Sequence, residues 1–420
     1  MEVVKVKYSA FRRLALICIV LLPGMPQTLQ AETLNPEPQT DSWQSCVATL
    51  RASAVNDGVS AETVDEVLGQ VTQLPRVIQL DRKQPEFTQT FTQYYELRVT
   101  DFRVTQGRNL LAKHAPLLAR IQAATGVPPQ YLVAFWGLET NFGSYFGKLP
   151  IPSALTTLAC DSRRSEFFAR ELIAILRIIE AGDIEHADLV GSWAGAIGHM
   201  QFMPTTYLEY AVDGDADGRR DLLGSVADAL TSGGSYLASI GWQEGYRWGR
   251  EVFVPEGFDF SVTGSEQWRP LSEWADLGIT DVFGVPLEAV GLEAALVVPS
   301  GHQGPAFLIY PNFRIIMKWN RSEHYALSVG RLADRIAGAG KLHKPLPSAE
   351  QSRFSTTAMM GLQSGLNALG YAAGEPDGVI GPATRKAIRS FQQQVGQIAD
   401  GYPTAALVTA VDQAVASQKR

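Results

Sequence analysis

The chain has 420 residues and a formal net charge of −7 at neutral pH. This acidic balance argues against nucleic acid or an anionic membrane surface as the main partner. Hydrophobic residues make up 45% of the chain, which is enough for a sizeable core. The length is typical of two or three domains.

The first predicted element is a secretory signal over residues 1–31. Basic residues precede the apolar run LALICIVLLPG, and the segment ends in the small residue Ala31. The run is too short for a transmembrane anchor, and no later segment is apolar enough to span a bilayer. We therefore expect export, cleavage near Ala31 and no stable membrane insertion.

Two cysteines, Cys46 and Cys160, follow this segment. Two cysteines in an oxidising compartment favour one disulfide, and the alternative is a pair of buried free thiols. Neither residue belongs to a CxxC pattern or a Cys/His cluster, which argues against a metal site.

Residues 128–143, PPQYLVAFWGLETNFG, predict an apolar helix that carries one carboxylate, Glu139. Glu139 follows Leu132, Phe135 and Trp136 at helical spacing, so it projects from the face expected to be buried. An apolar environment raises the pKa of a carboxyl group and suits it to act as a general acid. The alternative is a glutamate in a last helical turn whose tip reaches solvent.

A glycine-rich stretch, GSWAGAIGHMQFMP, covers residues 191–204. Its glycines lack side chains, so the backbone can approach a bulky ligand closely. Ser192 and Gln201 supply a hydroxyl and an amide, which suit a polyhydroxylated or acetamido substrate. The alternatives are a tight turn and a phosphate cradle, and the second is weak because neither GxxxxGK[ST] nor GxGxxG is present.

Residues 213–221, DGDADGRRD, begin like a calcium-binding loop with a glycine in sixth place. The twelfth position is Gly224, where such a loop carries glutamate, so either Asp221 or Asp228 completes the ligand shell. A solvated acidic turn is the alternative. The predicted ligands are the side chains of Asp213, Asp215, Asp217 and Asp228 and the carbonyl of Arg219.

The predicted secondary structure changes along the chain. Residues 33–250 are predicted to be mostly helical, whereas 251–318 contain the short β-prone runs EVFVP, AALVVP, AFLIYPNF and RIIMKW. Residues 341–352 form a polar, proline-containing linker, and 353–418 form a compact helical module. The predicted fold class is therefore mainly α (α+β), with a small β-rich part.

Four segments occur in fixed order, AFWGLETNFGSYFG, LTTLACDSRRSEFF, GSWAGAIGHMQFMPTTYLEYAVDGDADGRRD and PNFRIIMKWNRSEHYAL. Together they resemble the B-type lytic murein transglycosylases. The later runs LQSGLNALGY, DGVIGPATRKAIRSFQ and DGYPT resemble a three-helix peptidoglycan-binding module. The resemblance implies a periplasmic enzyme with a lysozyme-like catalytic region over residues 33–340, followed by this module.

The resemblance also implies roles for individual residues. Glu139 would protonate the oxygen between N-acetylmuramic acid and N-acetylglucosamine, then take a proton from the muramic O6 to leave a 1,6-anhydro end. Arg163 and Arg164 would suit acidic peptide stems or lactyl groups. The implied substrate-contacting residues are Ser192, Gln201, Tyr236, Asn320, Tyr325, Arg163 and Arg164. The calcium loop matches a family feature, and no organic cofactor is implied.

Two other functions stay open at this point. A hydrolytic muramidase of related fold would leave a reducing muramic acid end. A non-catalytic scaffold would bind the wall without needing Glu139. Under each, the expected partner is the glycan strand of peptidoglycan, and the sequence identifies no protein partner.

Overall fold

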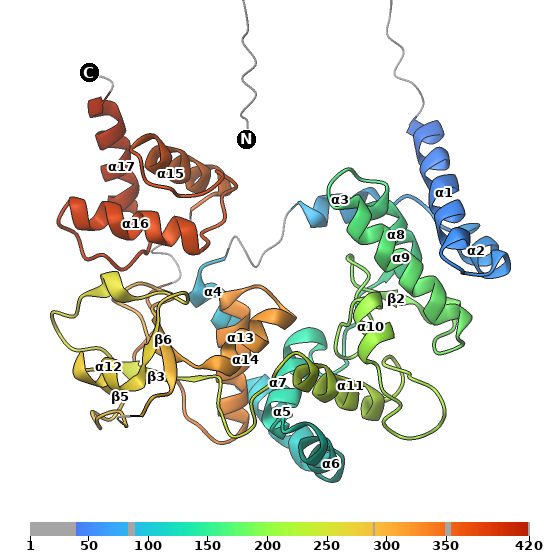
Figure 1. Ribbon diagram of the computed structural model, residues 1–420, viewed down its shortest axis with the longest axis horizontal. Helices are drawn as coiled ribbons and strands as arrows, with labels where there is room; N and C mark the ends of the chain where they lie inside the picture. The colour runs from blue at the N-terminus through green and yellow to red at the C-terminus, as the bar shows by residue number, and fades with distance from the viewer. Residues whose placement is uncertain (1–38, 83–88, 289, 349–353, 419–420) are drawn as a thin grey trace, which may run out of the picture. The chain divides into compact units, whose positions relative to one another are not determined.

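The computed structural model describes residues 39–82, 89–288, 290–348 and 354–418 (Figure 1). The predicted signal segment lies outside these residues. The chain divides into two units, 1–42 and 43–420, and every side chain discussed below belongs to the second. Within the described ranges, no helix has both the length and the apolar composition needed to cross a membrane.

Six helices form one group whose core includes an apolar stripe around Phe168 and Leu172. They are α1 (Gln39–Asn56), α2 (Ala61–Leu68), α3 (Pro75–Asp81), α8 (Ile151–Ala159), α9 (Ser165–Glu180) and α10 (Pro204–Tyr210). The stripe lies on one face of α9 because its members are spaced by three or four residues. α9 packs against α2, α8 and α10, so it is the central helix of the group.

A second group of helices surrounds the predicted catalytic helix. It contains α4 (Phe91–Arg98), α5 (Asp101–Lys113), α6 (Ala115–Thr125), α7 (Pro129–Thr140), α11 (Val226–Ser239), α13 (Pro311–Trp319) and α14 (Glu323–Ile336). α7 packs against α5, α6, α11 and α14. Pro129 occupies its first turn, where a missing N–H costs little. It ends where Asn141, Phe142 and Gly143 take positive φ angles of 49°, 61° and 77°.

Between these helices the chain forms a five-stranded antiparallel sheet with strand order β4-β6-β7-β3-β5. The strands are β3 (Gly249–Phe253), β4 (Trp268–Pro270), β5 (Thr280–Asp281), β6 (Glu293–Val297) and β7 (Ala306–Ile309). A separate two-stranded antiparallel sheet pairs β1 (Leu149–Pro150) with β2 (Val190–Gly191) across α8 and α9. The shorter elements are α12 (Leu271–Asp276) and the 3₁₀ turns η2 (His186–Asp188) and η3 (Phe260–Val262).

Both faces of the central strands are buried. On one face, Ala295 and Phe307 join the core of the helical groups. On the other face, Leu296 and Leu308 pack in a second core with Trp274 of α12. Alternate residues of a strand point to opposite faces, so continuous apolar runs are needed where both faces are covered.

The β-prone run RIIMKW is helical, and its prediction as a strand is wrong. It lies in α13, which begins at Pro311. A proline at the first helical position is pre-organised for a helix. Phe313 and Ile316 are three residues apart, and both are buried, which places them on one helical face.

The C-terminal module consists of α15 (Thr356–Ala368), α16 (Pro382–Gln394) and α17 (Ala405–Gln418) around a small core of its own. The described part of the predicted linker is not a free tether. The backbone N–H groups of His343 and Lys344 donate to the Glu251 carboxylate at 2.9–3.0 Å. This contact fixes the start of the linker against β3.

Candidate active site

The predicted acid, Glu139, lies in the last turn of α7 and is half-buried. The preceding residues Leu132, Phe135 and Trp136 are each no more than 3% exposed, so the helix face beneath it is apolar as predicted. The hydroxyl of Tyr325, in the first turn of α14, donates a hydrogen bond to Oε1 of Glu139. The α7–α14 packing therefore brings together two predicted site residues that are 186 positions apart.

An aromatic cluster lies beside this pair. The Trp319 ring centre lies 4.4 Å from that of Phe135 and 5.3 Å from that of Tyr236. Phe202, the neighbour of Gln201, approaches Trp319 at 5.5 Å. Burial raises the pKa of Tyr236, with a further contribution from the Glu209 carboxylate, so its hydroxyl stays protonated. These contacts gather residues from α7, α11, α13 and the glycine-rich loop.

The glycine-rich loop is tightly folded. A Cβ at Gly147 would lie 1.9 Å from the carbonyl oxygen of Gly191, so the two segments meet only because Gly147 lacks a side chain. Ser192 Oγ accepts the Ala196 N–H at 2.9 Å. Gln201 has a φ of +50°, and its side-chain amide donates to the Gly198 carbonyl at 3.0 Å. Left-handed backbone at a residue other than glycine persists only where surrounding structure enforces it.

His199 is a residue that the sequence analysis missed. Its Nδ1 accepts the indole N–H of Trp136 at 2.9 Å, and its carbonyl accepts the hydroxyl of Thr140 at 2.9 Å. Both partners flank Glu139 in α7. His199 therefore fastens the loop that carries Gln201 to α7. In the sequence, the feature that could have indicated this role is the histidine that stands between the glycines and Gln201 in GHMQFMP.

His199 should make stability depend on pH. Burial lowers its pKa from the ordinary value of 6.5 to about 4. Because the unfolded chain takes up the proton first, this contribution to stability is lost as the pH falls from about 6.5 to about 4. The upper bound on this loss of unfolding free energy is about 3 kcal/mol. The free energy of unfolding should therefore fall less steeply over this range in His199→Gln than in the unaltered chain.

His186→Gln is the matched control, because it makes the same substitution at a half-buried histidine outside the glycine-rich loop, in the 3₁₀ turn η2. Denaturant titrations at several pH values would compare the three proteins. Parallel pH profiles for the unaltered chain and His199→Gln would contradict the assignment of this linkage to His199.

The two predicted arginines are held by an aspartate at the end of another helix. Arg163 and Arg164 both form ion pairs with Asp81 at the end of α3, whose side chain is 3% exposed. The guanidinium of Arg164 also lies over the Phe168 ring, 4.9 Å from its centre. The structure thus gives this pair a structural partner, Asp81, which the sequence analysis did not identify.

Asn320 is the remaining residue predicted to contact substrate. It caps the C-terminus of α13, with its N–H donating to the Ile316 carbonyl at 3.3 Å. It is half-buried and directly follows Trp319 of the aromatic cluster. The end of α13 therefore places Asn320 next to the aromatic cluster.

The acidic loop gathers three of the predicted calcium ligands. One carboxylate oxygen from each of Asp213, Asp215 and Asp217 lies within 4.8 Å of the others. Gly218 takes a φ of +92°, which permits the sharp turn expected at the sixth position. The oxygen-only set and its negative charge fit a hard divalent cation.

Asp228 has a different environment. It is fully buried, and its two oxygens accept the N–H groups of Gly214 at 2.8 Å and Asp221 at 2.7 Å. It therefore holds the two ends of the loop together. Asp221 accepts the N–H groups of Leu223 and Gly224. The side chain of Arg219 reaches the Asp183 carbonyl at 3.2 Å.

A mainly helical fold with one glutamate beside an aromatic cluster and a glycine-rich loop defines a lysozyme-like enzyme. The family model "Transglycosylase SLT domain" matches residues 42–334. A second model, "Putative peptidoglycan binding domain", matches residues 356–411. The chain therefore belongs to the transglycosylase SLT family.

Known relatives agree with this assignment. The chain is 31% identical over 300 residues to membrane-bound lytic murein transglycosylase B of Escherichia coli, covering 67% of this chain and 79% of that protein. It is 43% identical to SltB3 of Pseudomonas aeruginosa in complex with NAG-anhNAM-pentapeptide, with a TM-score of 0.84, covering 88% of this chain and 99% of that one. The enzyme is a lytic murein transglycosylase.

The calcium loop has a precedent among the solved structures. The Escherichia coli lytic transglycosylase Slt35 has been solved in complex with calcium. This chain is 29% identical to it, with a TM-score of 0.61, and the match covers 70% of this chain and 92% of Slt35.

Proposed function

We propose that Glu139 is the single acid–base group with which this enzyme cleaves peptidoglycan. Its proton moves to the glycosidic oxygen as the bond from the N-acetylmuramic acid C1 to the N-acetylglucosamine O4 breaks. The muramic O6 then bonds to C1, and its proton returns to Glu139. No water is consumed, and the product ends in 1,6-anhydromuramic acid.

The contact between Glu139 and Tyr325 supports this role most directly. It positions the carboxyl group between an apolar helix face and the aromatic cluster. The hydroxyl donates to one oxygen of the carboxyl group and so orients the group while the other oxygen gives up and retrieves the proton. SltB3 was solved with an anhydro-muramoyl ligand, which is the type of product expected here. The substrate's own acetamido oxygen can stabilise the cationic carbon, so a second carboxylate is not required.

Mass spectrometry of the products tests this chemistry. Purified enzyme should release from isolated peptidoglycan fragments that are lighter, by the mass of one water, than hydrolytic products. Reducing muramic acid ends would instead identify a hydrolytic muramidase. Binding without any release would identify a scaffold.

The substrate contacts of the other predicted residues and of Trp319 are proposals too. Tyr236 and Trp319 offer ring faces on which sugar rings can stack. Ser192, Gln201 and Asn320 offer hydroxyl and amide groups for the acetamido and hydroxyl substituents. For Arg163 and Arg164 we propose a contact with acidic parts of the substrate at the groove edge, with Asp81 orienting the pair.

We further propose that Asp213, Asp215, Asp217 and the carbonyl of Arg219 hold a structural Ca²⁺, with Asp228 shaping the loop and closing the shell. The ion would balance three carboxylates that otherwise repel one another. It would stabilise the loop between α10 and α11 and take no part in bond cleavage.

Calcium should therefore raise the melting temperature of the chain, and a chelator should lower it. Binding to the native state alone adds about 2.7 kcal/mol at a free concentration 100-fold above Kd. Asp215→Asn should reduce this response because it removes a ligand charge, whereas Asp188→Asn in the exposed part of η2 should not. An unchanged melting temperature across millimolar calcium would argue against the site.

Export to the periplasm and removal of residues 1–31 complete the proposal. The basic and apolar pattern of that segment supports export, and so does the disulfide between Cys46 and Cys160. We propose residues 33–340 as the catalytic region, 341–352 as the linker and 353–418 as the peptidoglycan-binding module.

A further inference from the structure

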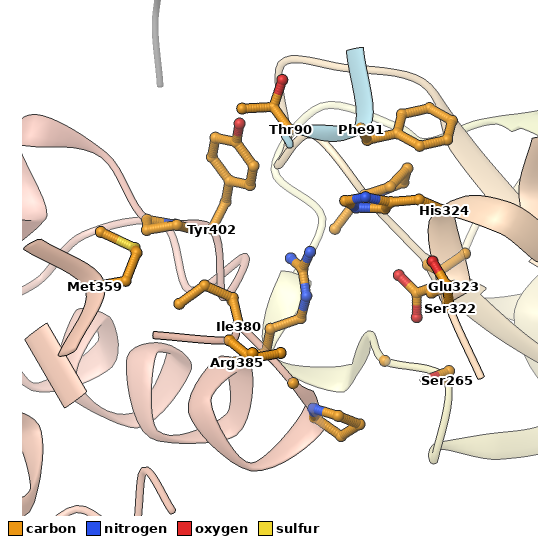
Figure 2. Close-up of a pocket in the computed structure, with 18 of the residues that line it drawn as sticks. Thr90, Phe91, Ser265, Ser322, Glu323, His324, Met359, Ile380, Arg385 and Tyr402 are labelled. Carbon is orange, nitrogen blue, oxygen red and sulfur yellow. The ribbon is translucent and has the colours of Figure 1, made fainter. Parts of the chain in front are cut away.

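A cavity of about 360 Å³ lies between the C-terminal module and the catalytic region. Figure 2 shows its two walls. The module contributes Met359, Ile380, Arg385 and Tyr402, and the catalytic region contributes Phe91, Glu323 and His324. Neither Glu139 nor Tyr325 lines this cavity, although Glu323 and His324 directly precede Tyr325.

Two polar contacts hold the walls of this cavity together. Arg389 of the module forms an ion pair with Glu266 at 2.9 Å. Asp400 of the module accepts the backbone N–H of His302 at 3.0 Å and lies 2.6 Å from Nδ1 of the same residue. Arg389 and Asp400 are both buried. A cavity with two such contacts at its margin belongs to an interface and is more than a gap at a surface.

Arg385 points into the cavity from the first turn of α16 (Figure 2). Among the residues that the structure describes, its guanidinium forms no hydrogen bond or ion pair. Gly381, the N-cap of the same helix, also lines the cavity, and a helix N-terminus favours negative charge. Three carboxylates also line the cavity: Glu266 and Asp400 are paired with Arg389 and His302, and Glu323 belongs to the catalytic-region wall. On the module wall, the half-buried guanidinium and the helix end together favour an anion.

The rest of the wall determines the kind of anion. Phe91, Met359, Ile380 and Tyr402 give it a largely apolar surface. The ring of His324 is packed against Phe91 at 5.6 Å. Burial and the nearby Arg385 hold the pKa of His324 well below its ordinary value, so it adds no charge of its own. The ligand should therefore combine a carboxylate with apolar side chains, which a short peptide does and a neutral sugar does not.

We propose that this cavity binds the peptide stem of peptidoglycan, with a stem carboxylate on the guanidinium of Arg385. The proposal rests on the proposed function, because it adds a peptide subsite to an enzyme that cleaves the attached glycan. The structure of SltB3 with NAG-NAM-pentapeptide shows that a peptide-bearing ligand suits a similar protein. A site shared by both parts of the chain would let the module select strands that still carry their stems.

Calorimetric binding of the free pentapeptide to the full chain tests this assignment. Arg385→Gln should weaken binding roughly 10-fold to 100-fold, since it removes a charge-assisted hydrogen bond. Lys386→Gln is the matched control, because it removes the same charge from the adjacent, exposed position of α16 and should bind normally. Amidating the peptide carboxyl groups should weaken binding to the unaltered chain by a similar factor, and should cost little further in Arg385→Gln.

Three results would overturn the peptide site. They are normal pentapeptide binding by folded Arg385→Gln, equal binding of the amidated peptide by the unaltered chain, and displacement of the pentapeptide by peptide-free NAG-NAM. The amidated peptide tests the same contact even if the variant does not fold. Cleavage of peptide-free glycan is measured separately. A chain that binds the pentapeptide but releases no anhydro product would refute the proposed function and leave this site standing.

Discussion

Glu139→Gln is expected to lower the rate of glycan cleavage by about 10²–10⁴-fold while leaving the fold intact. The amide is nearly isosteric, and its oxygen can still accept the hydroxyl of Tyr325. It cannot donate a proton to the glycosidic oxygen and take one back from the muramic O6. Release of soluble fragments from purified peptidoglycan, followed over time, measures the loss.

Glu96→Gln provides the control for this substitution, because Glu96 is an exposed glutamate of α4. It should cleave at the normal rate. Thermal melts should show that both variants fold like the unaltered chain. Normal turnover by a folded Glu139→Gln protein would remove Glu139 from the mechanism.

Loss of the disulfide should be the largest single effect on stability. Cys46 and Cys160 join α1 to the end of α8 across 114 positions. Opening a loop of this length gives the unfolded chain more conformations, and removing such a bridge typically costs about 2–5 kcal/mol. The double variant Cys46→Ala/Cys160→Ala should therefore unfold at a lower denaturant concentration.

Reduction supplies the complementary measurement. A thiol reductant should destabilise the unaltered chain towards the level of the double variant and should leave the double variant unchanged. If both proteins respond equally to the reductant, or if the double variant is as stable as the oxidised chain, the bridge does not contribute in this way.

Much of the fold could be predicted because its signals are local. The apolar stripe of α9 and the apolar face of α7 are periodic in the sequence, and both are buried. The strand prediction for RIIMKW was wrong because β-branched and bulky residues favour strands in isolation. In the structure, this segment is helical because Pro311 favours a helix start and Phe313 and Ile316 pack on one helical face.

The site was predictable to a different extent. Long motifs predict Glu139 and Gln201 as site residues, because each motif is continuous in the sequence. The contact of His199 with Trp136 and the ion pairs of Asp81 could not be found in this way. Each joins positions 63 to 83 residues apart, and only tertiary packing sets their distances. The cavity lined by Arg385 likewise requires segments from both parts of the chain.

The positions of the two cysteines in the chain also set the order of synthesis and disulfide formation. Cys46 is synthesised 114 residues before its partner, and α7 with Glu139 lies between them. At a synthesis rate of about 5–20 residues per second, the ribosome adds the second cysteine roughly 6–23 seconds after the first. The disulfide loop that contains α7 is therefore closed only after that helix has been made, and an oxidant that acts earlier meets an unpaired Cys46.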